Sequence, residues 1–374
     1  MRFSVIFISL VAIIPIATSM PAFAVTHHND LAVRPGYQEV WVLTRPDLVE
    51  VYDIQTVNLV NTFAVGGVPD AIIFDDNGSH FYIVTNYPDD RQSFLRCFEA
   101  NNGLLVSESP VGGIGLNAIV HSNGDVYVTS QGGGGQGIIA RFSPVSLNLL
   151  SSGTTQSWAE AICESEFDGS ILVGGFNREY EGGEMSSEII AHDPINLSTL
   201  HEYKYGIDPI DLLSVNELLV VEYKGIPIDF PESENYVHGL SIIDEQAGTE
   251  MFPWLTNPDI VRGSCYEPIN EKWFGFSFQP DTNSNGKLWM ICDLSNPRPV
   301  LLTEFQSNRI WVMVAVPLGS DSIRLFGIDS ENEDLFYYDT LGDYPPEAEF
   351  SANPNTDPSP LQVIIIKGYP TQAE

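Results

Sequence analysis

Short apolar runs recur along the whole chain, and each run is bounded by turn residues. Residues 71–74 and 81–85 form one such pair, and the segment between them contains Asn77-Gly78. Asn-Gly supplies the positive backbone angles that a tight hairpin needs, so this pair predicts two antiparallel strands. Both runs are apolar at consecutive positions, which predicts strands that are covered on both faces.

Strands similar to residues 81–85 return at a regular interval. They begin at positions 40, 81, 126, 171, 218, 273 and 323, so successive starts lie 41 to 55 residues apart. A repeat of about this length, with four strands in each unit, is typical of a β-propeller. The pattern therefore predicts an all-β, seven-bladed β-propeller with four-stranded blades and one domain over residues 25–374.

The first and last repeats predict how the ring closes. The first repeat lacks an obvious innermost strand, because the chain after residue 24 reaches the run at residue 40 almost directly. The last apolar run, residues 361–367, has no partner strand after it. We expect this closing strand to fill the innermost position of the first blade, with the Pro-rich segment 344–360 carrying the chain across.

The first 24 residues have the pattern of a signal peptide. Arg2 precedes an apolar stretch at residues 3–17, and a small-x-small cleavage pattern ends at Ala24. We expect cleavage after Ala24 and an exported protein that is periplasmic, extracellular or on the cell surface. No later run has the length of a membrane span, so we expect no span in the mature chain and a monomer.

Two strands and the turns before them carry a recognisable motif. Residues 81–86 read Phe-Tyr-Ile-Val-Thr-Asn, and residues 126–130 read Val-Tyr-Val-Thr-Ser. Residues 65–69 read Val-Gly-Gly-Val-Pro, and residues 75–78 read Asp-Asp-Asn-Gly. With these motifs the chain resembles the YVTN-repeat β-propellers, clearly in its first three repeats and by spacing alone in the last four.

The resemblance implies an exported or surface-associated seven-bladed propeller of the quinoprotein dehydrogenase-like superfamily. Members of the YVTN family include binding proteins. Related propellers include lactonases, lyases and quinoprotein dehydrogenases, so the resemblance supports the fold and the compartment without deciding the function.

The chain is strongly acidic, with 50 Asp and Glu against 16 Lys and Arg and a net charge of -34. Such a charge repels nucleic acid and anionic membranes, so we expect no nucleic-acid partner. The acidity has two interpretations, a surface for cations or cationic partners and a general adaptation to solubility or salt. No cofactor is predicted. Ca²⁺ is a weak candidate, because residues 281–286 begin like an EF-hand loop but Cys292 replaces its final Glu.

One polar residue stands near the start of each predicted innermost strand, where side chains would point toward the central channel. These candidate ligand-binding residues are Asp70, Asn117, Glu160, Asp211, Arg262, Arg309 and Gln362. Converging carboxylates and arginines can bind a polar ligand or a cation, or transfer protons. Long loops on the same face of the propeller mix carboxylates with aromatic residues. Their candidate contact residues are Arg178, Glu179, Tyr180, Asp229, Phe230 and Glu232.

Two functions remain open from the sequence. The first is a non-enzymatic exported propeller that binds a protein, a glycan, a small molecule or a cation through its loop-rich acidic face. The alternative is a hydrolase or lyase of the lactonase type, with Glu160, Asp211 and Arg262 as catalytic residues. A polar channel rim without a ligand is the simpler interpretation of the same residues. No histidine joins the ring, and the cysteines are expected as buried free thiols.

Overall fold

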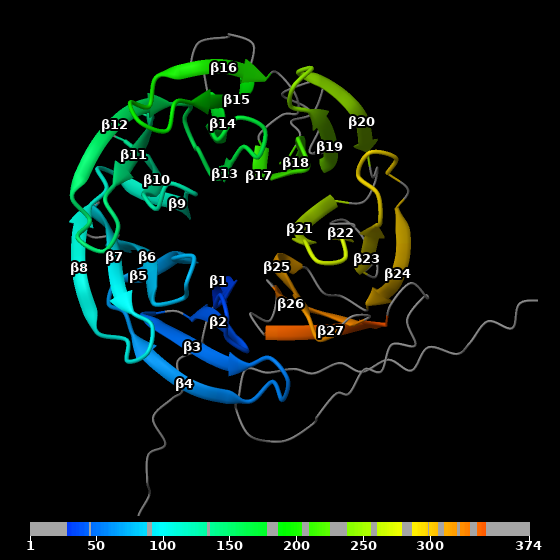
Figure 1. Cartoon of the computed structure of the whole chain (residues 1–374), viewed down its shortest axis with the longest axis horizontal. Helices are drawn as coiled ribbons and strands as arrows, with labels where there is room; N and C mark the ends of the chain where they lie inside the picture. Colours follow the sequence, from blue (N-terminus) through cyan, green and yellow to red (C-terminus); the bar gives the residue numbers. More distant parts are fainter. Residues whose placement is uncertain are drawn as a thin grey trace, which may run out of the picture.

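A computed structural model shows the chain as seven antiparallel sheets that stand around a central opening (Figure 1). The described residues are 28–44, 46–87, 92–132, 135–177, 186–203, 209–224, 238–255, 260–278, 286–297, 299–305, 310–319, 322–329 and 335–341. All regular elements in these ranges are strands, so none of them forms a helix able to cross a membrane. The all-β fold with seven propeller blades is therefore confirmed.

Within each sheet the strands follow one another from the channel outward (Figure 1). The innermost strands are β1 (His28–Val33), β5 (Val68–Phe74), β9 (Ile114–Val120), β13 (Ala161–Glu164), β17 (Pro209–Val215), β21 (Ile260–Glu267) and β25 (Ile310–Pro317). The second strands are β2 (Glu39–Thr44), β6 (His80–Tyr87), β10 (Val126–Gln131), β14 (Ile171–Asn177), β18 (Leu218–Lys224), β22 (Lys272–Phe278) and β26 (Ser322–Asp329).

The third and the outermost strands complete the sheets. The third strands are β3 (Leu48–Asp53), β7 (Gln92–Glu99), β11 (Gly137–Phe142), β15 (Ser186–His192), β19 (His238–Asp244), β23 (Gly286–Ile291) and β27 (Leu335–Leu341). The outermost strands are β4 (Leu59–Ala64), β8 (Leu105–Pro110), β12 (Leu149–Thr155), β16 (Thr199–Tyr203), β20 (Thr249–Leu255) and β24 (Val300–Phe305). The seventh sheet has three strands within the described residues.

The second strands are buried on both faces, as their consecutive apolar residues predict. All six residues of β10 are buried, and so are all but the first residue of β26. The reason is that each sheet lies face to face between two neighbouring sheets, so both sides of its central strands are covered.

The core is divided into layers between adjacent blades. Between the first two blades, Trp41 packs on Phe81 with ring centroids 4.9 Å apart, and Phe81 stacks on Phe98 at the same distance. Phe74 meets Trp41 edge to face, with ring centroids 5.2 Å apart. Aromatic residues fill the space between these two sheets, and their stacked and edge-to-face contacts hold the two blades together.

The first blade differs from the sequence prediction. Its innermost position is occupied by β1, which pairs antiparallel with β2 through Leu31 opposite Val42 and Val33 opposite Val40. The prediction that this blade lacks its own innermost strand, and that residues 361–367 replace it, is therefore wrong. Only three consecutive apolar residues, 31–33, mark this strand, which made the run too short to recognise. Residues 342–374 lie outside the described part.

Packing between the last and first blades closes the ring. Val316 and Phe326 of the seventh blade share one buried cluster with Leu31, Val40 and Tyr52 of the first blade. The guanidinium of Arg324 also donates hydrogen bonds to the carbonyl oxygens of residues 54 and 55 in the first blade. Ring closure in the described part thus depends on side-chain packing and an arginine between two separate sheets.

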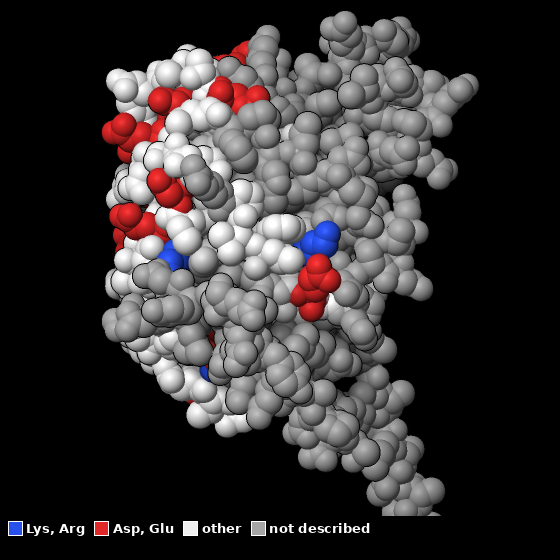
Figure 2. All heavy atoms as spheres, turned by 90° about the vertical axis from the view of Figure 1, so that its right-hand side faces the viewer, with Lys and Arg blue, Asp and Glu red and all other residues white. Residues whose placement is uncertain are grey.

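Acidic side chains are conspicuous on the described surface. Figure 2 shows them along one edge of the molecule, with basic side chains only in isolated places. This distribution agrees with the excess of Asp and Glu in the sequence.

The four cysteines, Cys97, Cys163, Cys265 and Cys292, are free thiols, as expected. Their burial was only partly predicted. Cys97 is buried, but Cys163 and Cys265 are half-buried, and Cys292 is exposed because it lies in the turn that follows β23.

Candidate functional site

The innermost strands share an irregularity near the predicted channel residues. The pairing of β5 with β6 shifts between Pro69 and Ala71, next to Asp70. The pairing of β17 with β18 shifts between Pro209 and Asp211. Similar shifts occur in the pairing of β1, β9, β21 and β25 with their second strands. Bulges of this kind change the direction of a side chain. Polar residues stand at or beside the irregularity in several of these strands, among them Asp30, Asp70, Asn117 and Asp211, whereas the residue at the β25 irregularity is Trp311.

Several of these polar residues line one cavity of about 300 Å³ in the channel. Asn117, Glu160 and Asp211, which the sequence predicted, come from the third, fourth and fifth blades. Asp30 from β1 and Glu222 from β18 line the same cavity. The remaining lining residues are Ile210, Gly263, Ser264, Val312 and Met313. The lining thus combines carboxylates from the first, fourth and fifth blades with apolar side chains from the fifth and seventh blades.

Asp30 is held in place by backbone hydrogen bonds. One carboxylate oxygen accepts the N–H of Leu31 at 2.8 Å, and the other accepts the N–H of Ile72 in the second blade at 2.9 Å. Burial raises the pKa of Asp30 to about 7, and the hydrogen bonds from Ile72 and Leu31 oppose this effect. The nearby charges of Asp211 and Asp70 raise the pKa further.

Asp211 has a similar environment. Burial raises its pKa to about 6, and the N–H of Leu212, which donates to Asp211 at 2.9 Å, acts in the opposite direction. Near neutral pH the cavity therefore contains two carboxyl groups, Asp30 and Asp211, that change protonation state. A group that titrates near neutral pH is suited to proton-coupled binding or to general acid–base chemistry.

Amide side chains position two further carboxyl residues. Asn117 donates from its side-chain nitrogen to the backbone carbonyl oxygen of Glu160 at 2.9 Å, which links the third and fourth blades. The side chain of Asn86 donates to Asp70 and, at 3.0 Å, to the carbonyl oxygen of Gly115. Hydrogen bonds from amide side chains therefore link the third blade to the second and fourth blades, and Asp70 is not among the residues that line the cavity.

The structure describes only part of the predicted site. Arg262 lies on β21, but its side chain lies outside the described part. The predicted residues that lie wholly outside the described residues are Arg309, Gln362, Arg178, Glu179, Tyr180, Asp229, Phe230 and Glu232.

Asp30 and Glu222 were not predicted from the sequence. Asp30 precedes the apolar run 31–33 in the same way that Asp70 precedes the run 71–74, and this similarity is the signal that could have revealed it. Glu222 follows a continuous apolar run on β18, and nothing in its local pattern marks it as a channel residue.

The cavity does not have the arrangement of a metal site in the residues that the structure covers. Among these residues, no group of three His, Cys, Asp or Glu side chains is placed to hold one metal ion. The acidic residues instead surround a space large enough for a small organic molecule. Carboxylates spread over several blades would contact different parts of such a ligand.

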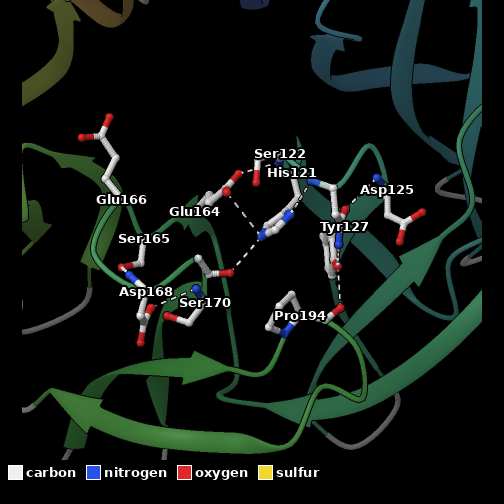
Figure 3. A network of polar contacts seen from close by, with 12 residues as sticks. His121, Ser122, Asp125, Tyr127, Glu164, Ser165, Glu166, Asp168, Ser170 and Pro194 are labelled. Atoms are coloured by element: carbon white, nitrogen blue, oxygen red, sulfur yellow. Dashed lines mark hydrogen bonds and ion pairs between the residues drawn. The ribbon is translucent and has the colours of Figure 1, made fainter.

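A second polar network lies between the third and fourth blades, in the turns after the innermost strands (Figure 3). The Nε2 of His121 donates to the carbonyl oxygen of Gly169 at 2.8 Å and lies 3.4 Å from Glu164. Its Nδ1 accepts the backbone N–H of Asn123 at 3.0 Å. These contacts join two blades, and His121 is separate from the channel cavity, as the sequence predicted.

No protein-family profile and no curated protein sequence matches this chain. Solved structures resemble its fold. Hydrazine synthase of Kuenenia stuttgartiensis aligns with a TM-score of 0.65 and 12% identity, over 88% of this chain and 98% of the other. The β-propeller domain of Cps50 (Swd1) from Myceliophteria thermophila aligns with a TM-score of 0.56 and 9% identity, over 82% and 95%. At these identities the likeness supports the propeller fold alone.

Proposed function

We propose that this chain is an exported binding protein of the YVTN-repeat type whose channel cavity binds a small organic cation. One observation carries the proposal. Four acidic residues from three blades line a single cavity, namely Asp30, Glu160, Asp211 and Glu222. None of the described residues lining this cavity is basic. A ligand with one or more ammonium groups would neutralise carboxylates that otherwise repel one another.

The raised pKa values predict the pH dependence of this binding. Asp30 and Asp211 have pKa values of about 7 and about 6, so they are largely protonated at pH 5 and ionised at pH 8. A cation binds more tightly to the ionised carboxylates than to the neutral groups. Its affinity therefore rises with pH, and binding near neutral pH releases protons.

Spermidine is a suitable probe, and calorimetry on residues 25–374 is the measurement. We expect binding that is at least tenfold tighter at pH 8 than at pH 5 and that is lost in the double variant Asp211→Asn/Glu160→Gln. The control variant Asp76→Asn/Glu99→Gln removes the same charge from two exposed positions away from the cavity and should bind normally. Equal weakening in both variants would show that spermidine binds only through the overall charge.

The hydrolase or lyase alternative is favoured by the same titrating groups. An Asp with a pKa near 6 or 7 can donate and accept a proton in one catalytic cycle. This alternative predicts turnover of a lactone, with loss of turnover in Glu160→Ala and Arg262→Ala while the fold is kept. Calcium remains a candidate ligand, and a rise in the unfolding temperature that is specific to Ca²⁺ would favour it over an organic cation.

A further inference from the structure

Arginine side chains connect adjacent blades at several junctions. Arg141 on β11 donates from Nε to Asp125 of its own blade at 2.6 Å and from Nη1 to the carbonyl oxygen of Ile195 in the next blade at 2.9 Å. Arg324 on β26 donates to Asp339 of its own blade and to two carbonyl oxygens of the first blade. In both cases one guanidinium bridges a carboxylate and a loop of the following blade.

Arg34 repeats this arrangement between the first and second blades. It donates from Nε to the carbonyl oxygen of Gly78 at 2.8 Å and from Nη1 to Glu39 at 3.1 Å. Its guanidinium also lies 3.6 Å from the centre of the Tyr37 ring. These junctions therefore combine a carboxylate and a backbone carbonyl, with an aromatic face at some of them, which is the chemistry that recognises a guanidinium.

The junction between the fourth and fifth blades has the same chemistry without an arginine in the equivalent strand positions. By strand register, Ala191 occupies the position of Arg141, and Leu172 occupies the position of Arg324. A groove of about 620 Å³ opens at this junction. Among the described residues that line the groove there is no Lys or Arg.

Aromatic rings form one wall of the groove. Phe167, in the turn after β13, is 40% exposed. The rings of His201 and Tyr203 meet edge to face, with centroids 4.9 Å apart, and His201 Nε2 lies 2.9 Å from the Tyr203 hydroxyl. That hydroxyl donates to the carbonyl oxygen of Glu245 at 3.3 Å, which fixes the ring against the fifth blade.

Carboxylates and a loop backbone complete the groove. Asp168 and Glu202 line it and are exposed. The loop of the fifth blade contributes Glu245 and Gln246, which correspond to the residues whose carbonyl oxygens receive Arg324 in the first blade. A guanidinium entering this groove would thus meet a carboxylate, an aromatic face and a carbonyl-bearing loop.

We propose that this groove binds an arginine side chain presented by a basic segment of a partner protein. Three other junctions hold the chain's own arginine between the same kinds of groups, Arg141 and Arg324 from strand positions and Arg34 from the turn after β1. The net charge of -34 attracts a basic segment at long range, and the groove supplies the specific contacts. This groove is formed by the turn after β13, the outermost strand β16 and the turn after β19, so its occupancy does not depend on the ligand of the channel.

The test uses the peptide Gly-Ala-Arg-Ala-Gly amide and its citrulline analogue, which has nearly the same shape but no charge. Saturation-transfer NMR on residues 25–374 in 150 mM NaCl measures both affinities. We expect the arginine peptide to bind at least tenfold more tightly than the citrulline peptide. The variant Asp168→Asn/Glu202→Gln should weaken the arginine peptide at least tenfold, whereas Asp76→Asn/Glu99→Gln should change its affinity less than twofold.

Three results would overturn the proposal. They are absence of binding at millimolar peptide, equal binding of the citrulline peptide, and equal weakening in both double variants, which indicates attraction by overall charge. Binding of N-acetylglucosamine that is lost in Phe167→Ala but kept in Asp168→Asn/Glu202→Gln would identify the groove as a glycan site instead. Circular dichroism melting of each variant checks that the fold is intact.

Discussion

Replacement of Asp30 by Asn should stabilise the protein relative to wild type by an amount that grows as the pH rises. A carboxyl with a pKa near 7 in the folded state and 3.8 in the unfolded state binds its proton more tightly when folded. The wild-type protein therefore loses stability as the pH rises from about 4 through 7. The two pKa values correspond to about 4 kcal/mol, an upper limit because part of the side chain faces the cavity.

The variant removes this cost but also one hydrogen bond. An amide has a single oxygen, so it cannot accept from both Leu31 and Ile72, and the lost contact costs about 1 kcal/mol. At pH 5 the cost of ionisation in wild type is already of the same size as the lost hydrogen bond, so we expect Asp30→Asn to lie within about 1 kcal/mol of wild type there and to be about 2 kcal/mol more stable at pH 8. Urea unfolding followed by tryptophan fluorescence at pH 5, 6, 7 and 8 measures the difference.

The exposed turn residue Asp76 provides the control, and Asp76→Asn should shift stability by less than about 0.5 kcal/mol at every pH. A difference between Asp30→Asn and wild type that stays constant with pH would refute the reasoning. In that case the Asp30 carboxyl would have the same proton affinity in the folded and unfolded states.

Three further changes test the packing of the ring. Gly137→Ala should lower the free energy of unfolding by about 3 kcal/mol or more, because its Cβ would lie 1.6 Å from the carbonyl oxygen of Gln156. Arg324→Met should cost about 3 kcal/mol in the same assay, since a carboxylate and two carbonyl oxygens at the ring closure lose their charged donor. Cys292 should react rapidly with a disulfide reagent in the native protein, whereas Cys97, whose pKa burial raises to about 12, should react only on unfolding.

Matched measurements make these outcomes informative. Gly169→Ala, where φ is +70° and nothing lies within 4 Å of the new Cβ, should cost only about 1 kcal/mol. Similar losses for both glycine variants would contradict the steric argument. A wild-type melting temperature for Arg324→Met would show that apolar packing alone closes the ring. Fast reaction of Cys97 in the native state would contradict its burial.

Local patterns were sufficient to predict most of the strands. The runs at residues 71–74 and 81–85, with Asn77-Gly78 between them, became β5 and β6 in the expected pairing. The reason is that a hairpin depends on residues close together in the chain, whose apolar content and turn chemistry are visible in the sequence. The prediction failed at β1, where the apolar run is only three residues long.

The sequence by itself determined the all-β class, the number of repeats and the polar position near the start of several innermost strands, including Asn117, Glu160 and Asp211. Only the tertiary structure decided that Asp30 joins them, that its pKa is near 7, and that a groove lies between the fourth and fifth blades. The physical reason is distance along the chain. A periodic pattern records what each blade contains, whereas burial, mutual repulsion of charges and unfilled space arise only when blades far apart in sequence meet around the ring.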